Sequence, residues 1–221
     1  MSTVTTEKSK TTSRKAKVLH DYAIEGVNRV HGLTYDGANV WFADGTRGGL
    51  TAVDPRTGKT VKRLADVPAD AGTAFDGTHL WQLAEDRIQK IDPKTGKILS
   101  TLPAPGKGKD SGMTWAEGAL WIGQYKERLI HKVDPKTGKV LKTIASDRFV
   151  TGVTWIDGEL WHGTAEDQVS DIRRVDPESG KLLDRIELPA GTAVAGVEAD
   201  DRGRIWYADT NTGHICAIAR R

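Results

Sequence analysis

The chain has 221 residues, of which 38% are hydrophobic, 28% are charged and 24 are glycine, a composition typical of a soluble globular protein with many turns. Lys and Arg total 32 and Asp and Glu total 30, for a net charge of +2, so the basic excess of many nucleic-acid binders is absent. No apolar run approaches the roughly 18 residues of a membrane span, and the single cysteine, Cys216, excludes an internal disulfide framework. We therefore expect neither nucleic acid nor a membrane as a partner.

The first 14 residues (MSTVTTEKSKTTSR) are polar and contain no apolar segment. This composition predicts a disordered tail, followed by a single folded domain over residues 15–221. A secretory signal would need an apolar stretch that is missing here, so the expected location is the cytoplasm. Residues 17–24, which follow the tail, are predicted to form a β-strand.

Tryptophan recurs at a regular interval along the rest of the chain. Trp41, Trp81, Trp121 and Trp161 follow one another every 40 residues, and Trp206 follows after 45. A repeat of about 40 residues is typical of the blades of a β-propeller. Since every repeat carries one tryptophan, we interpret these side chains as packing between blades and not as a ligand-binding set.

Each repeat is predicted to form four short strands. The first strand begins at a glycine, and a tight turn such as Asp36-Gly37 leads into the strand that ends with the tryptophan. The third strand ends at an Asp-Pro turn such as Asp54-Pro55, and the fourth follows that turn. The last repeat stops after its third strand, and residues 17–24 match the missing fourth. The sequence therefore predicts an all-β, five-bladed β-propeller of four-stranded blades, closed by an N-terminal strand that completes the C-terminal blade. A β-sandwich is the alternative, but it does not explain the repeat.

A binding or catalytic site is expected where the loops meet the central channel, at positions where the repeats differ. We compared four positions of each repeat, namely the residue before the first-strand glycine, the second residue after it, and the first and third residues after the tryptophan. In repeats one and five, which become neighbours when the ring closes, these positions hold one histidine and three carboxylates: His31, Asp44, Glu198 and Asp209. Such a group suits acid–base catalysis, or one divalent cation held with the help of Asp44 and Asp209. In the alternative interpretation, the aspartates cap their own turns.

His162 is the second candidate base, so the predicted catalytic residues are His31, His162 and Glu198. A further set of hydroxyl, amine and phenol side chains is predicted to bind substrate: Ser111, Thr114, Thr151, Thr154, Tyr125, Lys126 and Tyr207.

The repeats resemble the bacterial and plant-type glutamine cyclotransferases, a family of five-bladed propellers. The resemblance covers roughly residues 17–219 and is carried by residues 31–37 (HGLTYDG), 80–92 (LWQLAEDRIQKID) and 129–144 (LIHKVDPKTGKVLKTI). The last repeat, residues 196–218 (GVEADDRGRIWYADTNTGHICAI), is more similar to virginiamycin B lyase, gluconolactonase and NHL-type propellers.

The resemblance implies the fold more strongly than the activity. The cyclotransferase pocket uses acidic, tryptophan and asparagine side chains around the first-strand glycines, where this chain has Thr34, Ala71, Ser111 and Thr151. We therefore do not expect glutamine cyclotransferase activity. The histidine-bearing motif of the lyase is not reproduced either.

The leading hypothesis is an enzyme that acts on a small polar molecule at the central channel, by elimination (a lyase) or by opening a lactone or ester. The competing hypothesis is a non-catalytic propeller that binds a protein or small ligand on the same face, with an exposed aromatic patch around Phe42, Phe149 and Tyr207. We expect a monomer, because a closed ring with a charged surface has no evident need to associate.

Overall fold

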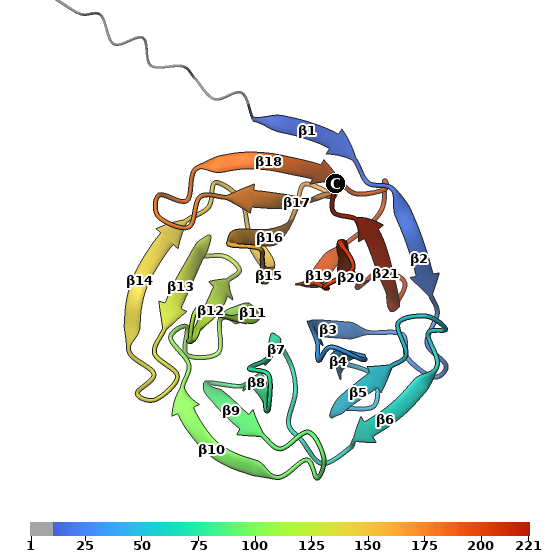
Figure 1. The fold of residues 1–221 in the computed structure, drawn as a ribbon, viewed down its shortest axis with the longest axis vertical. Helices are drawn as coiled ribbons and strands as arrows, with labels where there is room; N and C mark the ends of the chain where they lie inside the picture. Colours follow the sequence, from blue (N-terminus) through green and yellow to red (C-terminus); the bar gives the residue numbers. More distant parts are fainter. Residues whose placement is uncertain (1–10) are drawn as a thin grey trace, which may run out of the picture.

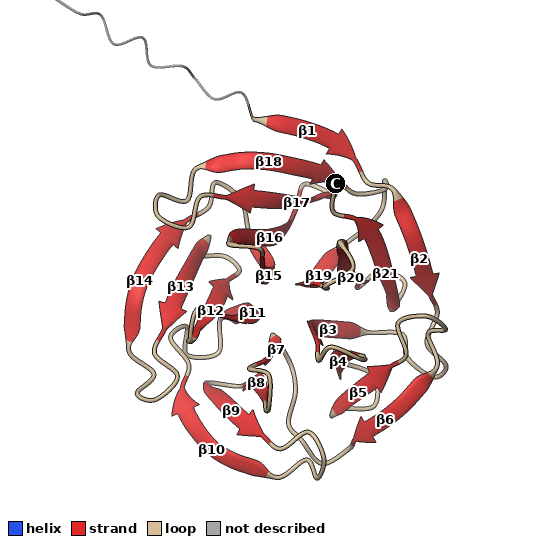
Figure 2. Ribbon diagram, in the orientation of Figure 1, coloured by secondary structure: helices blue, strands red, loops and turns tan. Residues whose placement is uncertain are grey.

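A computed structural model of the chain describes residues 11–221 as 21 strands in five sheets. The sheets are arranged as blades around a central axis, and their innermost strands converge on that axis (Figure 1). Strands and loops account for all the described residues (Figure 2). Over residues 11–221 there is no helix long and apolar enough to cross a membrane. The predicted all-β, five-bladed propeller is confirmed.

Three blades are formed by consecutive four-stranded meanders. Blade one comprises β3 (Val30–Tyr35), β4 (Val40–Asp44), β5 (Leu50–Val53) and β6 (Thr60–Leu64). Blade two comprises β7 (Thr73–Phe75), β8 (Leu80–Ala84), β9 (Arg87–Ile91) and β10 (Ile98–Pro103). Blade three comprises β11 (Asp110–Ala116), β12 (Ala119–Gln124), β13 (Leu129–Val133) and β14 (Val140–Ala145).

The N-terminal segment takes part in the other two blades. Blade five comprises β19 (Val194–Ala199), β20 (Arg204–Asp209), β21 (His214–Ala219) and, as its outer strand, β2 (Val18–Tyr22). β2 pairs antiparallel with β21, so the ring is closed as the sequence predicts. Blade four comprises β15 (Val150–Ile156), β16 (Glu159–Glu166), β17 (Val169–Val175) and β18 (Leu182–Glu187).

Blade four also carries a fifth strand that the sequence did not predict. β1 (Thr12–Lys15) lies parallel to β18 at the outer edge of the sheet. The hydroxyl of Thr12 donates to Asp184 at 2.6 Å and that of Ser13 donates to Glu187 at 2.9 Å. These contacts order a segment that has no apolar side chain, so the predicted tail does not extend to residue 14. Residues 1–10 of that tail lie outside the described residues.

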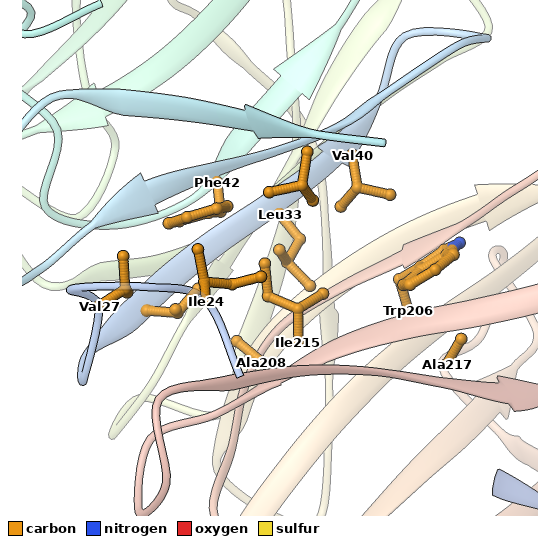
Figure 3. Packing of buried hydrophobic residues seen from close by; sticks show 11 residues of the cluster. Ile24, Val27, Leu33, Val40, Phe42, Trp206, Ala208, Ile215 and Ala217 are labelled. Atoms are coloured by element: carbon orange, nitrogen blue, oxygen red, sulfur yellow. The ribbon is translucent and has the colours of Figure 1, made fainter. Parts of the chain in front are cut away.

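The predicted role of the repeated tryptophans as blade-to-blade packing is consistent with their burial. Trp206 belongs to one buried cluster with Val40, Phe42, Ile24 and Ile215 between blades five and one (Figure 3). The indole N–H groups of most of these tryptophans donate to carboxylates at the hairpin turns, with distances of 2.6 Å (Trp41–Asp36), 2.9 Å (Trp81–Asp76), 3.2 Å (Trp161–Glu159) and 2.8 Å (Trp206–Asp200). In these four blades the hairpin is thereby tied to the core beneath it.

The five first-strand glycines form a ring in which each blade touches the next. An ideal Cβ atom placed on Gly112 would lie 2.4 Å from the Cα atom of Gly152, and one placed on Gly196 would lie 2.9 Å from the carbonyl carbon of Gly32. No side chain fits at such distances, so glycine is required for this close approach. The same contact recurs at the remaining members, Gly32, Gly72 and Gly152. We call these five residues the glycine ring.

Candidate functional site

A cavity of about 670 Å³ lies on one side of the glycine ring, where the connections between blades meet the axis. It is lined by all five residues that precede the ring glycines: His31, Ala71, Ser111, Thr151 and Ala195. In four blades, the first strand shifts register at this point, as between the pairs Val30–Asp44 and Leu33–Phe42 of blade one. Such β-bulges change the direction of a side chain. Here each bulge includes the residue before the ring glycine, which lines the cavity.

Four of the predicted site residues line this cavity. They are His31, Ser111, Thr151 and Tyr125. The Ser111 hydroxyl donates to the carbonyl of Val150 at 2.6 Å, which leaves its oxygen lone pairs available to a ligand. The Thr151 hydroxyl is buried and has no hydrogen-bond partner among the described residues. This oxygen lies against Gly163, 2.7 Å from the position that a Cβ on that glycine would take, and is closed off from solvent.

Thr114, Thr154 and Glu198 lie elsewhere, two residues beyond the ring glycines, and do not line the cavity. They are buried, and the Thr154 hydroxyl donates to Glu198 at 3.0 Å while accepting the N–H of Ala199 at 2.8 Å. Burial raises the pKa of Glu198 to about 8, although hydrogen bonds to its carboxyl act in the opposite direction. The glycine ring separates these three buried residues from the residues that line the cavity. The predicted convergence of Glu198 with His31 is therefore not observed.

His162 and Tyr207 follow the tryptophans on second strands and are buried between blades. Burial lowers the pKa of His162 to about 4 and raises that of Tyr207. Lys126 is exposed and, like them, does not line the central cavity. Phe42 and Tyr207 are both buried, so the aromatic surface patch predicted for a non-catalytic binding protein is not present around them.

Asp44 and Asp209 each bind the turn that follows them. Asp44 accepts the backbone N–H groups of Thr46 and Arg47 at 3.0 and 2.9 Å and the Arg47 guanidinium at 2.7 Å. Asp209 accepts the N–H of Ala193 at 3.1 Å and that of Asn211 at 3.0 Å. Within residues 11–221 there is no group of three or more His, Cys, Asp or Glu arranged to hold a metal ion. Turn capping, the alternative interpretation, accounts for both residues.

Three charged residues that the sequence comparison missed line the cavity: Arg29, Asp70 and Asp110. Asp70 and Asp110 stand two residues before the ring glycines, one position beyond those compared. At this position the other three repeats carry buried valines, namely Val30, Val150 and Val194. A departure from valine to aspartate in two neighbouring repeats was therefore visible in the sequence.

Asp110 is the titratable group best suited to proton transfer. Burial in the wall raises the pKa of its carboxyl to about 6, and the charge of Glu127 contributes in the same direction. The N–H of Gly106 donates to both carboxylate oxygens, at 3.0 and 2.9 Å, which opposes the rise and fixes the orientation of the carboxylate. Hence Asp110 is mainly a carboxylate at pH 7 but can be protonated at little cost.

His31 lies on the opposite part of the rim, against the turn at Gly45. Its Nε2 atom is 2.6 Å from the position that a Cβ on Gly45 would take. Burial, followed by the positive charge of Arg29, lowers the pKa of His31, while Asp70 raises it. The imidazole is therefore neutral at pH 7, and it can act as a hydrogen-bond partner or as a second base.

Comparisons with known proteins identify the fold. No protein-family model matches the sequence, and no curated protein matches it. Among solved structures, the chain is similar to glutaminyl cyclase of Myxococcus xanthus, with a TM-score of 0.78, 16% identity and coverage of 95% of this chain and 97% of that one. It is also similar to a chain of the nidogen/laminin complex, with a TM-score of 0.58, 17% identity and coverage of 85% of this chain and 74% of that one. A third similar structure is the Cps50 (Swd1) β-propeller domain of Myceliophteria thermophila, with a TM-score of 0.58, 9% identity and coverage of 92% of this chain and 99% of that one. At these identities the likeness shows the fold alone, and it confirms the predicted resemblance to the glutamine cyclotransferase propeller at that level.

Proposed function

We propose that the protein is an enzyme that moves a proton on a small polar molecule bound in the central cavity, in a lyase reaction or in the opening of a lactone or ester. The observation that carries this proposal is Asp110, a fixed, half-buried carboxylate facing the cavity with a pKa of about 6. A general base is most effective when its pKa lies near the working pH, and such perturbed groups in cavities are typical of catalytic sites.

In a lactone or ester opening, the Asp110 carboxylate takes a proton from water as the water oxygen attacks the carbonyl carbon. The Arg29 guanidinium is the group in the wall that can stabilise the oxyanion. The protonated Asp110 then returns its proton to the departing alkoxide, which leaves an acid and an alcohol. In an elimination, the same carboxylate removes a proton next to a carbonyl group and the leaving group departs with the electron pair.

The remaining polar groups would bind the substrate. Ser111 offers an acceptor, and Tyr125 forms the wall at the boundary of blades three and four, where its hydroxyl donates to the carbonyl of Ala165 at 3.4 Å. Glutamine cyclotransferase activity is not proposed, because the residues expected for it are replaced. We place the reaction in the cytoplasm and in a monomer, as predicted from the sequence.

The test is turnover of a panel of simple lactones and carboxylic esters by the wild type and by Asp110→Asn. The variant keeps the shape of the side chain but cannot accept a proton, and a loss of about 100-fold or more in kcat is expected. The wild-type rate should rise as the pH increases through about 6, because only the carboxylate is active. Asp86→Asn, at an exposed carboxylate in the β8–β9 turn outside the cavity, is the matched control. Equal activity of Asp110→Asn and the wild type would refute the role of Asp110.

A further inference from the structure

The strand β1, at the outer edge of blade four, takes no part in closing the ring or in lining the central cavity. It lies parallel to β18 on the outside of the blade, and after two further residues the chain turns into β2 on blade five (Figure 1). None of its four residues belongs to a hydrophobic cluster within residues 11–221. The propeller is therefore complete without β1.

The edge of β18 contacts the side chains of β1 as well as its backbone. Asp184 accepts the Thr12 hydroxyl at 2.6 Å and also pairs with the Arg14 guanidinium, which donates in addition to the backbone carbonyl of Arg220. The side chain of Asp184 is only 9% exposed. A hydroxyl and a guanidinium two residues apart thus meet one nearly buried carboxylate, and such charge-assisted contacts are specific as well as strong.

This carboxylate is particular to blade four. In each blade, one residue of the outer strand lies in the same cross-strand row as the repeated tryptophan. In blade four this residue is Asp184. In the other blades it is Lys62, Ser100, Lys142 or His20. A lysine would repel an incoming arginine, whereas Asp184 attracts it, so blade four alone presents an edge suited to a basic strand.

A cavity of about 660 Å³ lies where β1 and β18 end. Its wall includes Lys15 and Ala16 and the apolar side chains of Val169, Leu188 and Pro189, and Val169 is 53% exposed. The N–H of Ala16 donates to the carbonyl of Glu187 at 2.8 Å, after which the chain turns toward blade five. A strand that continued along β18 instead of turning would reach this cavity.

The charges in the wall of this cavity are balanced. Arg185 pairs with Glu187 at 2.6 Å, and Asp171 pairs with Arg173 at 2.8 Å. Lys15 belongs to β1 and would leave with it. The cavity therefore favours an apolar side chain over a charged one.

β1 is held by contacts that another strand can replace. Thr12, Ser13 and Lys15 are exposed, and polar contacts at such an edge offset little more than the conformational entropy lost when the segment is ordered. A competing strand that also placed an apolar residue in the cavity would gain burial that β1 lacks.

We propose that the outer edge of blade four, with the cavity at its end, binds an extended segment of a partner protein as an added parallel strand. The segment carries a hydroxyl residue and an arginine two positions apart, followed by an apolar residue. β1 occupies the first part of this site as an internal substitute that the partner displaces. The site is separate from the central cavity, and the inference does not depend on the proposed function.

The test is fluorescence anisotropy with a labelled synthetic peptide, Thr-Thr-Ser-Arg-Lys-Leu-Leu, and the full chain. Arg14→Glu places a carboxylate against Asp184 and should release β1, which faster hydrogen exchange at residues 182–187 would verify. The peptide should bind this variant at least about tenfold more tightly than the wild type, because β1 no longer competes for the edge. A peptide without the two leucines should bind about tenfold more weakly than the full peptide.

Two substitutions in the Arg14→Glu background test the location of the site. Asp184→Asn removes the carboxylate and should abolish binding of the peptide. Asp86→Asn, at a side chain that is 69% exposed in blade two, should leave binding unchanged. Bound peptide should slow hydrogen exchange at residues 182–187 and at no other outer strand.

The proposal is overturned if Arg14→Glu binds the peptide no more tightly than the wild type, if Asp184→Asn keeps the affinity, or if the peptide protects another blade. Dimerisation of Arg14→Glu without peptide, measured by light scattering, would assign the edge to a second copy and reject the partner. Ser13→Pro is a second means of releasing β1. If neither substitution speeds hydrogen exchange at residues 182–187, β1 is a permanent part of blade four and the proposal fails.

Discussion

Replacing Glu198 by glutamine is expected to stabilise the protein, and to do so increasingly as the pH rises from 4.5 to 8. Glutamine has nearly the same shape, so its carbonyl oxygen can accept the hydrogen bond from Thr154 that Glu198 accepts at 3.0 Å. Glutamine does not ionise. The difference in unfolding free energy between the variant and the wild type therefore isolates the cost of keeping an ionisable carboxyl group in this buried position.

The magnitude follows from the two protonation states. The pKa of Glu198 rises from 4.5 to about 8 in the folded protein. Below pH 4.5, both the folded and unfolded states are protonated and Glu198 has no effect on the pH dependence. Between pH 4.5 and 8, only the unfolded state loses its proton, so the wild type loses about 1.4 kcal/mol of unfolding free energy per pH unit. The total is about 3 to 5 kcal/mol at pH 8, or roughly 10 °C in Tm for a domain of this size.

The assay is urea unfolding of both proteins from pH 4 to 9, followed by the fluorescence of the buried tryptophans. The difference in unfolding free energy should be constant below pH 4.5, rise between pH 4.5 and 8, and become constant again. Glu85→Gln is the control, because Glu85 is 72% exposed, and its difference from the wild type should vary by less than about 0.5 kcal/mol. A constant difference for Glu198→Gln across this range would show that Glu198 is ionised in the fold, and would refute the argument from burial.

Three further changes test other parts of the structure. Gly112→Ala should destabilise the protein by about 3 kcal/mol or more in urea unfolding, because the added Cβ would lie 2.4 Å from Gly152; a loss below about 1 kcal/mol would mean that the ring can widen. His162→Gln should gain about 3 kcal/mol relative to the wild type as the pH falls from 6.5 to 4, since the folded pKa of His162 is lowered to about 4 and the unfolded histidine takes up a proton first; a pH-independent difference would contradict this. Glu159→Ala should lower Tm by about 2 to 6 °C, because the Trp161 indole N–H and the Arg174 guanidinium both lose their acceptor, and an unchanged Tm would show that these two contacts contribute nothing.

The sequence allowed the fold to be predicted because the framework repeats. The tryptophan interval, the Asp-Gly and Asp-Pro turns and the missing fourth strand of the last repeat together determined the number of blades and the closure by β2. β1 was not predictable in the same way, because it matches no repeat. It is held by hydroxyl–carboxylate contacts with Asp184 and Glu187, partners that only the folded chain brings near it.

The candidate site was predictable only in part, for a geometric reason. Thr151 and Thr154 have the same chemistry and lie in one strand, yet the bulge before Val153 and the ring at Gly152 place only Thr151 in the cavity. A comparison of residue types cannot separate two such positions. The identity of Asp110 was visible in the sequence, but its raised pKa depends on burial and on the nearby charge of Glu127, and both arise only once the chain has folded around the cavity.

The pairing of β2 with β21 bears on how the ring is built during synthesis. Val18 pairs with Ile218, so this contact joins positions 200 residues apart, whereas the meanders of blades one to three pair only neighbouring strands. Contacts between distant positions form slowly because a long loop must close first. On the ribosome, the emerging chain can stack its first blades while the fifth remains incomplete. We therefore expect a gapped, horseshoe-shaped intermediate with unpaired strand edges, which persists until β21 is released and is the state most prone to aggregation.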